Sequence, residues 1–157
     1  MKMFSAYDAV QFAIRIEENG EAWYREAGST AVDEEAKQLF LRLAEKEADH
    51  RGLFQRMLDN LGNRPLLESY PGEYLAYLRD HIDGRAVFER DGRSGPEAGS
   101  DASKVLEFAL QRELDSMLYF EALKAFVVDR DLKAVDAIIA EERMHFTELS
   151  RIRDRSR

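Results

Sequence analysis

The sequence predicts an all-α fold, a bundle of four helices arranged as two antiparallel hairpins. Four long segments repeat apolar residues at the three- and four-residue spacing of a helix, and convincing strand-type alternation occurs nowhere. The segments cover about residues 7–28, 33–61, 101–127 and 131–153. Short joints separate the first from the second and the third from the fourth, as in helix hairpins.

The ends of these segments carry helix boundary signals. Asp33, Asp101 and Asp131 begin the last three segments, where an aspartate can accept hydrogen bonds from the N–H groups of the first turn. Gly28 ends the first segment and Gly62 follows the second, and both are the expected helix stops. Each segment therefore has at least one boundary that its own residues predict.

A crossover of about residues 62–101 separates the two hairpins. It suits a connection that runs along the whole bundle, because a helix of about 28 residues spans roughly 42 Å. Within it, Pro71–Ile82 has a proline in its first turn and apolar residues at helical spacing, which predicts a short extra helix. All 157 residues are expected to form one domain, with hairpins at about 5–61 and 102–153.

Composition excludes several classes of protein. The formal net charge of −8 argues against nucleic-acid binding, and no apolar run approaches the roughly 20 residues of a membrane span. The absence of cysteine excludes disulfides, thiol catalysis and Cys-ligated metal sites. Asp8, Arg15 and Glu17 would interrupt the apolar region of a signal peptide, so a cytoplasmic location is expected.

The two hairpins resemble each other in sequence. The segment QFAIRIEENGEAWY aligns with EFALQRELDSMLYF 96 residues later, and FLRLAEKEADH aligns with VDAIIAEERMH 95 residues later. The alignment pairs Glu17 with Glu113, Glu47 with Glu142, and His50 with His145. Two copies of one unit predict an approximate two-fold axis through the bundle, so a group on that axis would meet each of these side chains twice.

The paired positions place metal-binding side chains on otherwise apolar faces. Residues at i and i+3 share a helix face, so Glu47 with His50, and Glu142 with His145, can bind a metal ion together. Four buried carboxylates without compensation would neutralise, whereas two divalent cations would balance their charge. One Glu on each of two helices, with Glu-x-x-His on each of the others, is the ligand pattern of di-metal carboxylate bundles. These donors favour iron, with manganese or zinc as alternatives.

The same segments resemble the rubrerythrin branch of the ferritin-like superfamily. The resemblance rests on IEENGEAWY and LAEKEADH in the first hairpin and on QRELDSMLYF and IAEERMHF in the second. It implies a ferritin-like bundle with a non-haem di-iron centre that reacts with hydrogen peroxide or oxygen. The implied ligands of the two iron ions are Glu17, Glu47, His50, Glu113, Glu142 and His145. Tyr24 resembles the family tyrosine that hydrogen-bonds a ligand carboxylate.

Some positions depart from the family pattern. Rubrerythrins carry a rubredoxin-like Cys₄ iron domain, and this sequence has no cysteine, so a separate electron-donor protein is expected. Ser116 stands where peroxidase-type members often carry another carboxylate, and Phe120 is the repeat partner of Tyr24. Glu21 and Glu141 stay open as additional ligands.

The resemblance implies an oxidoreductase that reduces hydrogen peroxide or oxygen with external electrons and works as a homodimer, without nucleic-acid or membrane partners. An alternative is a ferroxidase that handles iron in a larger oligomer. A third interpretation is a metal-free interaction bundle. Metal content, oligomer size and the choice of oxidant distinguish the three.

Overall fold

The computed structural model describes residues 4–62 and 100–155. Within these ranges it contains four long helices: α1 (Ala6–Thr30), α2 (Glu34–Leu61), α4 (Ala102–Leu123) and α5 (Leu132–Arg155). Two 3₁₀ turns, Lys124–Phe126 and Asp129–Asp131, connect α4 to α5. The predicted all-α bundle of two hairpins is confirmed, whereas the predicted helix at Pro71–Ile82 lies outside the described residues.

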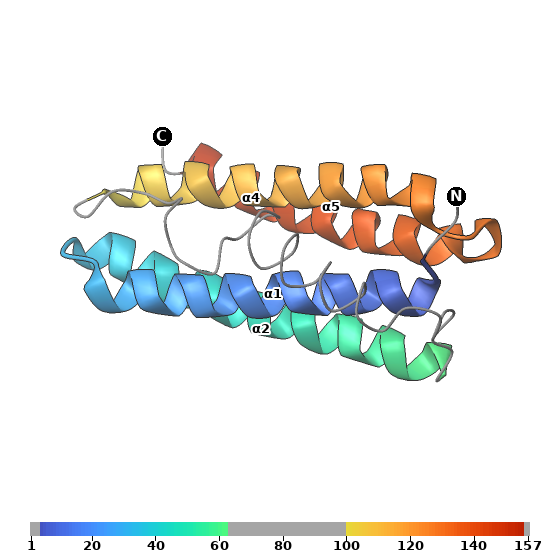
Figure 1. Ribbon diagram of the computed structural model, residues 1–157. Helices are drawn as coiled ribbons and strands as arrows, with labels where there is room; N and C mark the ends of the chain where they lie inside the picture. Colours follow the sequence, from blue (N-terminus) through green and yellow to red (C-terminus); the bar gives the residue numbers. More distant parts are fainter. Residues whose placement is uncertain (1–3, 63–99, 156–157) are drawn as a thin grey trace.

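The two hairpins lie side by side (Figure 1). α1 packs mainly against α2, and α4 packs mainly against α5, while the hairpins meet through α2 with α4 and α1 with α5. The end of α2 and the start of α4 lie at opposite ends of the bundle, so these two helices run parallel (Figure 1). The crossover that the sequence predicts between them lies outside the described residues.

Side-chain caps set the starts of three helices. Ser5 and Asp8 form a capping box at α1, where the Asp8 N–H donates to Ser5 Oγ at 3.1 Å and the Ser5 N–H donates to Asp8 Oδ2 at 2.8 Å. Asp33 and Asp101 cap α2 and α4 as predicted. Each accepts a hydrogen bond from the backbone N–H three residues later, at 2.7 and 3.0 Å respectively. Gly62 ends α2 with a φ of 66°.

One predicted boundary is wrong, and another residue has an unexpected partner. Gly28 lies inside α1, which continues to Thr30. A Cβ at Gly28 would lie 3.2 Å from Leu41 Cδ2, so the glycine lets α1 and α2 approach closely. Asp131 directly precedes α5, but its Oδ2 accepts a hydrogen bond from the Ala6 N–H at 2.9 Å. This contact ties the start of α1 to the second hairpin.

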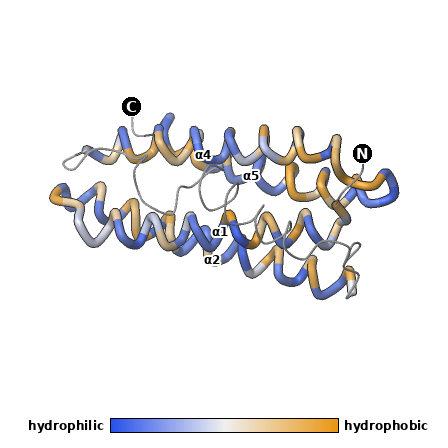
Figure 2. Tube along the Cα trace, in the orientation of Figure 1, coloured by the Kyte–Doolittle hydropathy of each residue, from blue (hydrophilic) through white to orange (hydrophobic). Residues whose placement is uncertain are grey.

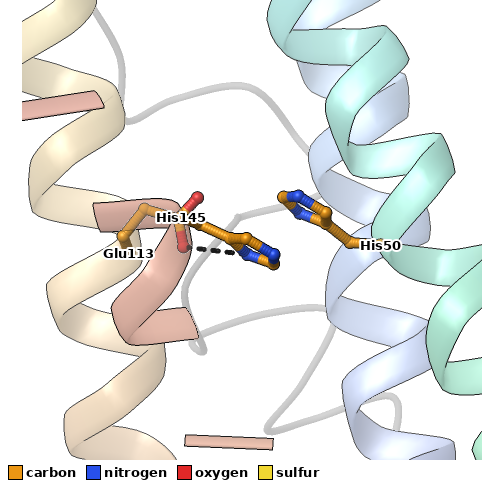
Figure 3. A group of neighbouring side chains, drawn as sticks. All are labelled: His50, Glu113 and His145. Carbon is orange, nitrogen blue, oxygen red and sulfur yellow. Dashed lines mark ion pairs between the residues drawn. The ribbon is translucent and has the colours of Figure 1, made fainter. Parts of the chain in front are cut away.

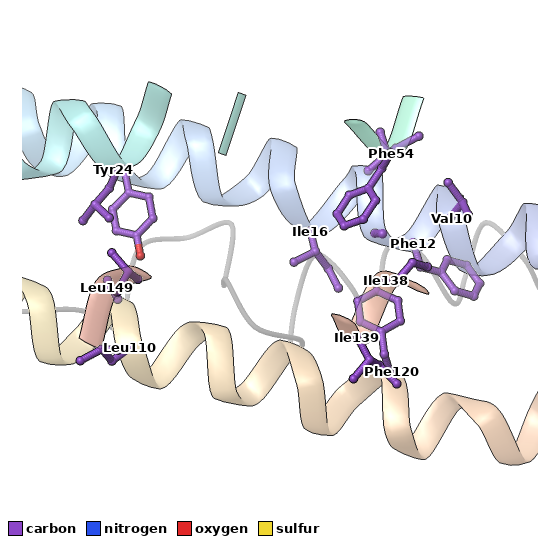
Figure 4. Packing of buried hydrophobic residues seen from close by; sticks show 14 of the residues in the cluster. Val10, Phe12, Ile16, Tyr24, Phe54, Leu110, Phe120, Ile138, Ile139 and Leu149 are labelled. Carbon is purple, nitrogen blue, oxygen red and sulfur yellow. The ribbon is translucent and has the colours of Figure 1, made fainter. Parts of the chain in front are cut away.

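Buried apolar residues of all four helices form one core cluster, part of which is drawn in Figure 4. Tyr24, Leu110 and Leu149 lie toward one end of it, and Val10, Phe54, Phe120 and Ile138 lie toward the other. On every helix, buried apolar residues come both before and after the acid that the sequence singles out. Hydrophobic and hydrophilic residues alternate along each helix, as expected for amphipathic helices (Figure 2). No helix within residues 4–62 and 100–155 combines the length and apolarity that crossing a bilayer requires.

The Asp33→Ala variant is expected to lower the free energy of unfolding by about 1 kcal/mol, because α2 loses the acceptor for an N–H of its first turn. Urea denaturation followed by circular dichroism measures the change. Asp33→Asn keeps an acceptor oxygen and should recover most of the loss. An equal loss in both variants would show that the cap does not stabilise α2.

Candidate metal centre

Six polar side chains meet in the middle of the apolar interior. They are Glu17 on α1, Glu47 and His50 on α2, Glu113 on α4, and Glu142 and His145 on α5. The four acids and His145 are between 2% and 8% exposed, and the His50 side chain is 12% exposed. The structure thus brings together all six residues that the sequence predicts as metal ligands.

Within each hairpin an imidazole faces a carboxylate of the neighbouring helix. His50 Nδ1 lies 3.6 Å from Glu17 Oε2, and His145 Nδ1 lies 3.8 Å from Glu113 Oε2. His145 Nδ1 also lies 4.0 Å from Glu142 Oε1. These separations are longer than hydrogen bonds. They approach those of two ligands that share one divalent ion, each at about 2.1 Å from it.

The two histidine rings meet between the hairpins. The ring centroids of His50 and His145 lie 3.1 Å apart, and the ring planes are parallel within 2°. Figure 3 shows the rings approaching from α2 and α5, with Glu113 beside His145. The contact joins equivalent positions of the sequence repeat, so the approximate two-fold axis passes through the cluster.

Burial raises the pKa of all four carboxyl groups, and desolvation is the largest cause for each. The pKa values of Glu17 and Glu113 are raised further by the charges of neighbouring acids. The pKa of Glu142 rises to about 7, although the nearby Ser116 hydroxyl favours its charged form. The cluster therefore concentrates acids where protons or cations must balance their charge.

Burial has the opposite effect on the two imidazoles. Desolvation lowers the pKa of His50 to about 4 and that of His145 to about 3, and the charge of Lys46 lowers both further. Both rings are therefore neutral at pH 7. A neutral imidazole has a free nitrogen lone pair, which is the form that binds a metal ion.

The donor atoms of the cluster fit a pair of divalent metal ions. Eight buried side-chain atoms have no hydrogen-bond partner among the described residues, and half of them belong to the cluster: Glu17 Oε2, His50 Nδ1, Glu142 Oε1 and His145 Nδ1. Buried polar atoms without partners are costly, so their concentration at one point indicates a ligand. The possible ligand atoms form two sets, and within each set all of them lie within 4.8 Å of one another. One set is Glu17, Glu47 and His50, and the other is His50, Glu113 and His145. Oxygen with neutral nitrogen donors suits iron, manganese or zinc.

Tyr24 lies beside the acids and is 1% exposed. Figure 4 shows its hydroxyl pointing into the interior of the bundle. Desolvation raises the pKa of this phenol, and the charges of Glu47 and Glu113 raise it further. Its position is consistent with the predicted hydrogen bond to a ligand carboxylate, which stays a prediction.

Glu21 and Glu141, the two possible additional ligands, do not belong to the cluster of six. Glu21 pairs with Arg25 at 2.8 Å and with Arg51 at 3.1 Å, so two guanidinium groups already balance its charge. The i,i+4 spacing of Glu21 and Arg25 was visible in the sequence, whereas the contact with Arg51 depends on how α1 packs on α2. Glu141 is half-buried. Ser116 is 2% exposed and lies near Glu142, so its hydroxyl is buried beside the cluster.

Comparisons with known proteins agree with this fold. A protein-family model described as Rubrerythrin matches residues 8–152. Among solved structures, the chain is similar to a crystal structure from Thermotoga maritima described as a candidate ferritin-like diiron-carboxylate protein. The TM-score is 0.52 and the sequence identity 25%, over 100% of this chain and 99% of that one. No curated protein matches the chain.

Proposed function

Because the chain belongs to the rubrerythrin family, we propose that it binds two iron ions and reduces hydrogen peroxide with electrons from a separate donor. The observation that carries the proposal is the buried cluster of four acids and two neutral imidazoles on the repeat axis. The description of the similar Thermotoga maritima structure as a diiron-carboxylate protein supports the choice of metal.

Each hairpin would supply the main ligands of one ion. Glu17, Glu47 and His50 would hold the first, and Glu113, Glu142 and His145 would hold the second. The charge arithmetic favours a pair, because two divalent ions carry four positive charges against four carboxylates. A cluster that balances its charge in this way needs no buried counter-ion from elsewhere in the protein.

When bound, the iron pair supplies the two electrons that cleave the O–O bond of peroxide, which with two protons yields two waters. The protein contributes a site that excludes water and fixes the orientation of the donor side chains. The buried apolar residues that precede and follow the cluster on every helix exclude bulk water. The i,i+3 spacing of Glu47 and His50 holds both donors on one face of α2, and Tyr24 orients a carboxylate.

The electrons come from outside this sequence. Its 157 residues include no cysteine, so it contains no Cys-ligated redox centre that could reduce the irons again. A donor protein that docks on the bundle, or a redox centre elsewhere, is required for turnover.

Ser116 favours a second candidate function, a ferroxidase that oxidises Fe(II) in handling iron. A serine in place of the additional carboxylate leaves one negative charge fewer beside Glu142. A site with fewer fixed charges holds oxidised iron less tightly, which suits a centre that passes iron on. The two candidates differ in which oxidant reacts faster.

Anaerobic loading with Fe(II), followed by stoichiometric peroxide or oxygen, tests the choice of oxidant. Metal analysis should find two irons per chain, and near-ultraviolet stopped-flow absorbance should show faster oxidation by peroxide than by oxygen. A chain that binds no iron would reject both candidates. Faster oxidation by oxygen would reject the peroxidase and favour the ferroxidase.

A further inference from the structure

Two aromatic side chains of α1 that can be oxidised lie in contact near the acid cluster. Tyr24 is buried, and the charges of Glu47 and Glu113 act on its hydroxyl. Trp23 is only partly buried and packs against the core from outside. The two rings form an edge-to-face pair with centroids 5.3 Å apart and planes at 84°. The pair therefore extends from the acid cluster toward the protein surface.

Neighbouring helices hold the Trp23 ring in a defined orientation. The indole stacks on Phe108 of α4, with centroids 4.5 Å apart, and lies 5.8 Å from Phe40 of α2. The Arg112 guanidinium covers the same Phe108 ring at 5.0 Å from its centroid. Aromatic contacts from two other helices keep the distance between Trp23 and Tyr24 fixed.

We propose that Trp23 and Tyr24 form a relay that carries single oxidising equivalents from the buried site to the protein surface. The inference rests on the proposed redox function and deepens it. When the external donor is absent and the site can supply only one electron, peroxide is split into hydroxide and a hydroxyl radical, and this one-electron oxidant remains in the site. Indole and phenol are the side chains of this cysteine-free sequence that lose one electron most readily.

Each step of the relay moves one electron and one proton. Tyr24 gives an electron to the oxidant in the site and its phenolic proton to a neighbouring carboxylate. The Tyr24 radical then takes an electron from Trp23 and recovers the proton from that carboxylate, while the indole nitrogen releases its own proton to water. A soluble one-electron reductant, such as a thiol or ascorbate, reduces the Trp23 radical, and water returns the proton.

The sequence repeat supplies an internal comparison. The positions equivalent to Trp23 and Tyr24 are Tyr119 and Phe120, whose rings form a similar edge-to-face pair at 5.0 Å and 80°. Phenylalanine does not yield an electron under these conditions, so the second hairpin keeps the ring geometry without an oxidisable residue at the buried position. Only the first hairpin therefore contains a complete relay among the described residues.

Radical transfer in the full-length chain tests the relay without metal. Trp23 is the single tryptophan of the sequence, so azide radicals from pulse radiolysis, which oxidise indole selectively, place the first radical there. The visible band of the indolyl radical should decay while the tyrosyl band rises at the same rate. This transfer is the Tyr24–Trp23 step of the relay in reverse, and its rate measures the electronic coupling that both directions share; in the relay, the surface reductant removes the Trp23 radical and so draws the step outward. Tyr24→Phe should abolish this phase. Tyr7→Phe should retain it, because Tyr7 lies about 25 Å away along the same helix.

Two results would overturn the proposal. Transfer that continues unchanged in Tyr24→Phe would exclude Tyr24 as the acceptor. A transfer rate that rises with protein concentration in the wild type would show that molecules collide rather than relay internally. The concentration dependence is measured on the wild type, so it still tests whether the transfer is intramolecular if circular dichroism shows that Tyr24→Phe has lost helix content. Because no metal is present, failure of the relay is distinct from failure of iron binding, which titration measures separately.

Discussion

Glu142→Gln is expected to make the metal-free chain more stable at pH 8, although most substitutions in a core destabilise. The folded structure raises the pKa of Glu142 from its ordinary value of 4.5 to about 7. This rise corresponds to roughly 3 kcal/mol of unfavourable free energy once the group is ionised. Glutamine keeps the shape of the side chain and has no charge to bury.

The folded chain binds the proton of Glu142 more tightly than the unfolded chain does. As the pH rises from 4.5 to about 7, the unfolded chain releases this proton first, so the free energy of unfolding falls. Above about pH 7 both states are ionised and the penalty is complete. The advantage of Glu142→Gln should therefore be large at pH 8 and small at pH 4.

Urea denaturation in the presence of a chelator measures this advantage. Glu141→Gln is the matched control, since it makes the same chemical change one position earlier on α5 at a half-buried residue. Its effect should stay within about 0.5 kcal/mol. Equal stabilisation by both substitutions would mean that general charge, rather than burial in the cluster, causes the effect. The same Glu142→Gln variant should bind less metal.

Metal loading is expected to produce the largest change in stability. One ion present at a thousandfold excess over its Kd adds about 4 kcal/mol to the folded state, and two ions together add about 8 kcal/mol. The thermal midpoint of the wild type should rise accordingly when Mn(II), or anaerobic Fe(II), is added. A wild type whose midpoint does not respond to any divalent metal would contradict the proposed site.

The two-fold repeat makes the histidine variants informative. His50→Ala and His145→Ala each remove one neutral nitrogen donor, and each should lose a similar part of the metal-dependent rise. The double variant should lose most of it. Met144→Ala is the control, because Met144 precedes His145 but is 57% exposed. An undiminished rise in the double variant would exclude the imidazoles as ligands.

The four helices could be predicted from the sequence because local signals and burial agree along most of their length. Asp33 and Asp101 cap helices as their positions indicate. The prediction that Gly28 ends α1 is wrong because a glycine can either end a helix or allow close packing, and only the contact with Leu41 on α2 distinguishes the two roles. Asp131 likewise has a partner 125 residues away, which no local pattern encodes.

The cluster of six could be predicted because the repeat presents each type of ligand twice. A single Glu-x-x-His on a helix is weak evidence, whereas two copies at equivalent positions identify a shared location. The contacts that depend on packing between helices could not be predicted. Arg51 reaches Glu21 from α2, and Phe108 stacks on Trp23 from α4. Their partners are distant in sequence and carry no periodic signal.

The internal repeat bears on how such a protein can originate. Each hairpin carries one acid on its first helix and an acid with an imidazole on its second, so two identical hairpins related by rotation would build the whole centre. A half-length ancestor that self-associated would have been sufficient. After gene fusion, the sequences of the two halves could change independently. The pairs Trp23–Tyr24 and Tyr119–Phe120 are one place where the two halves now differ.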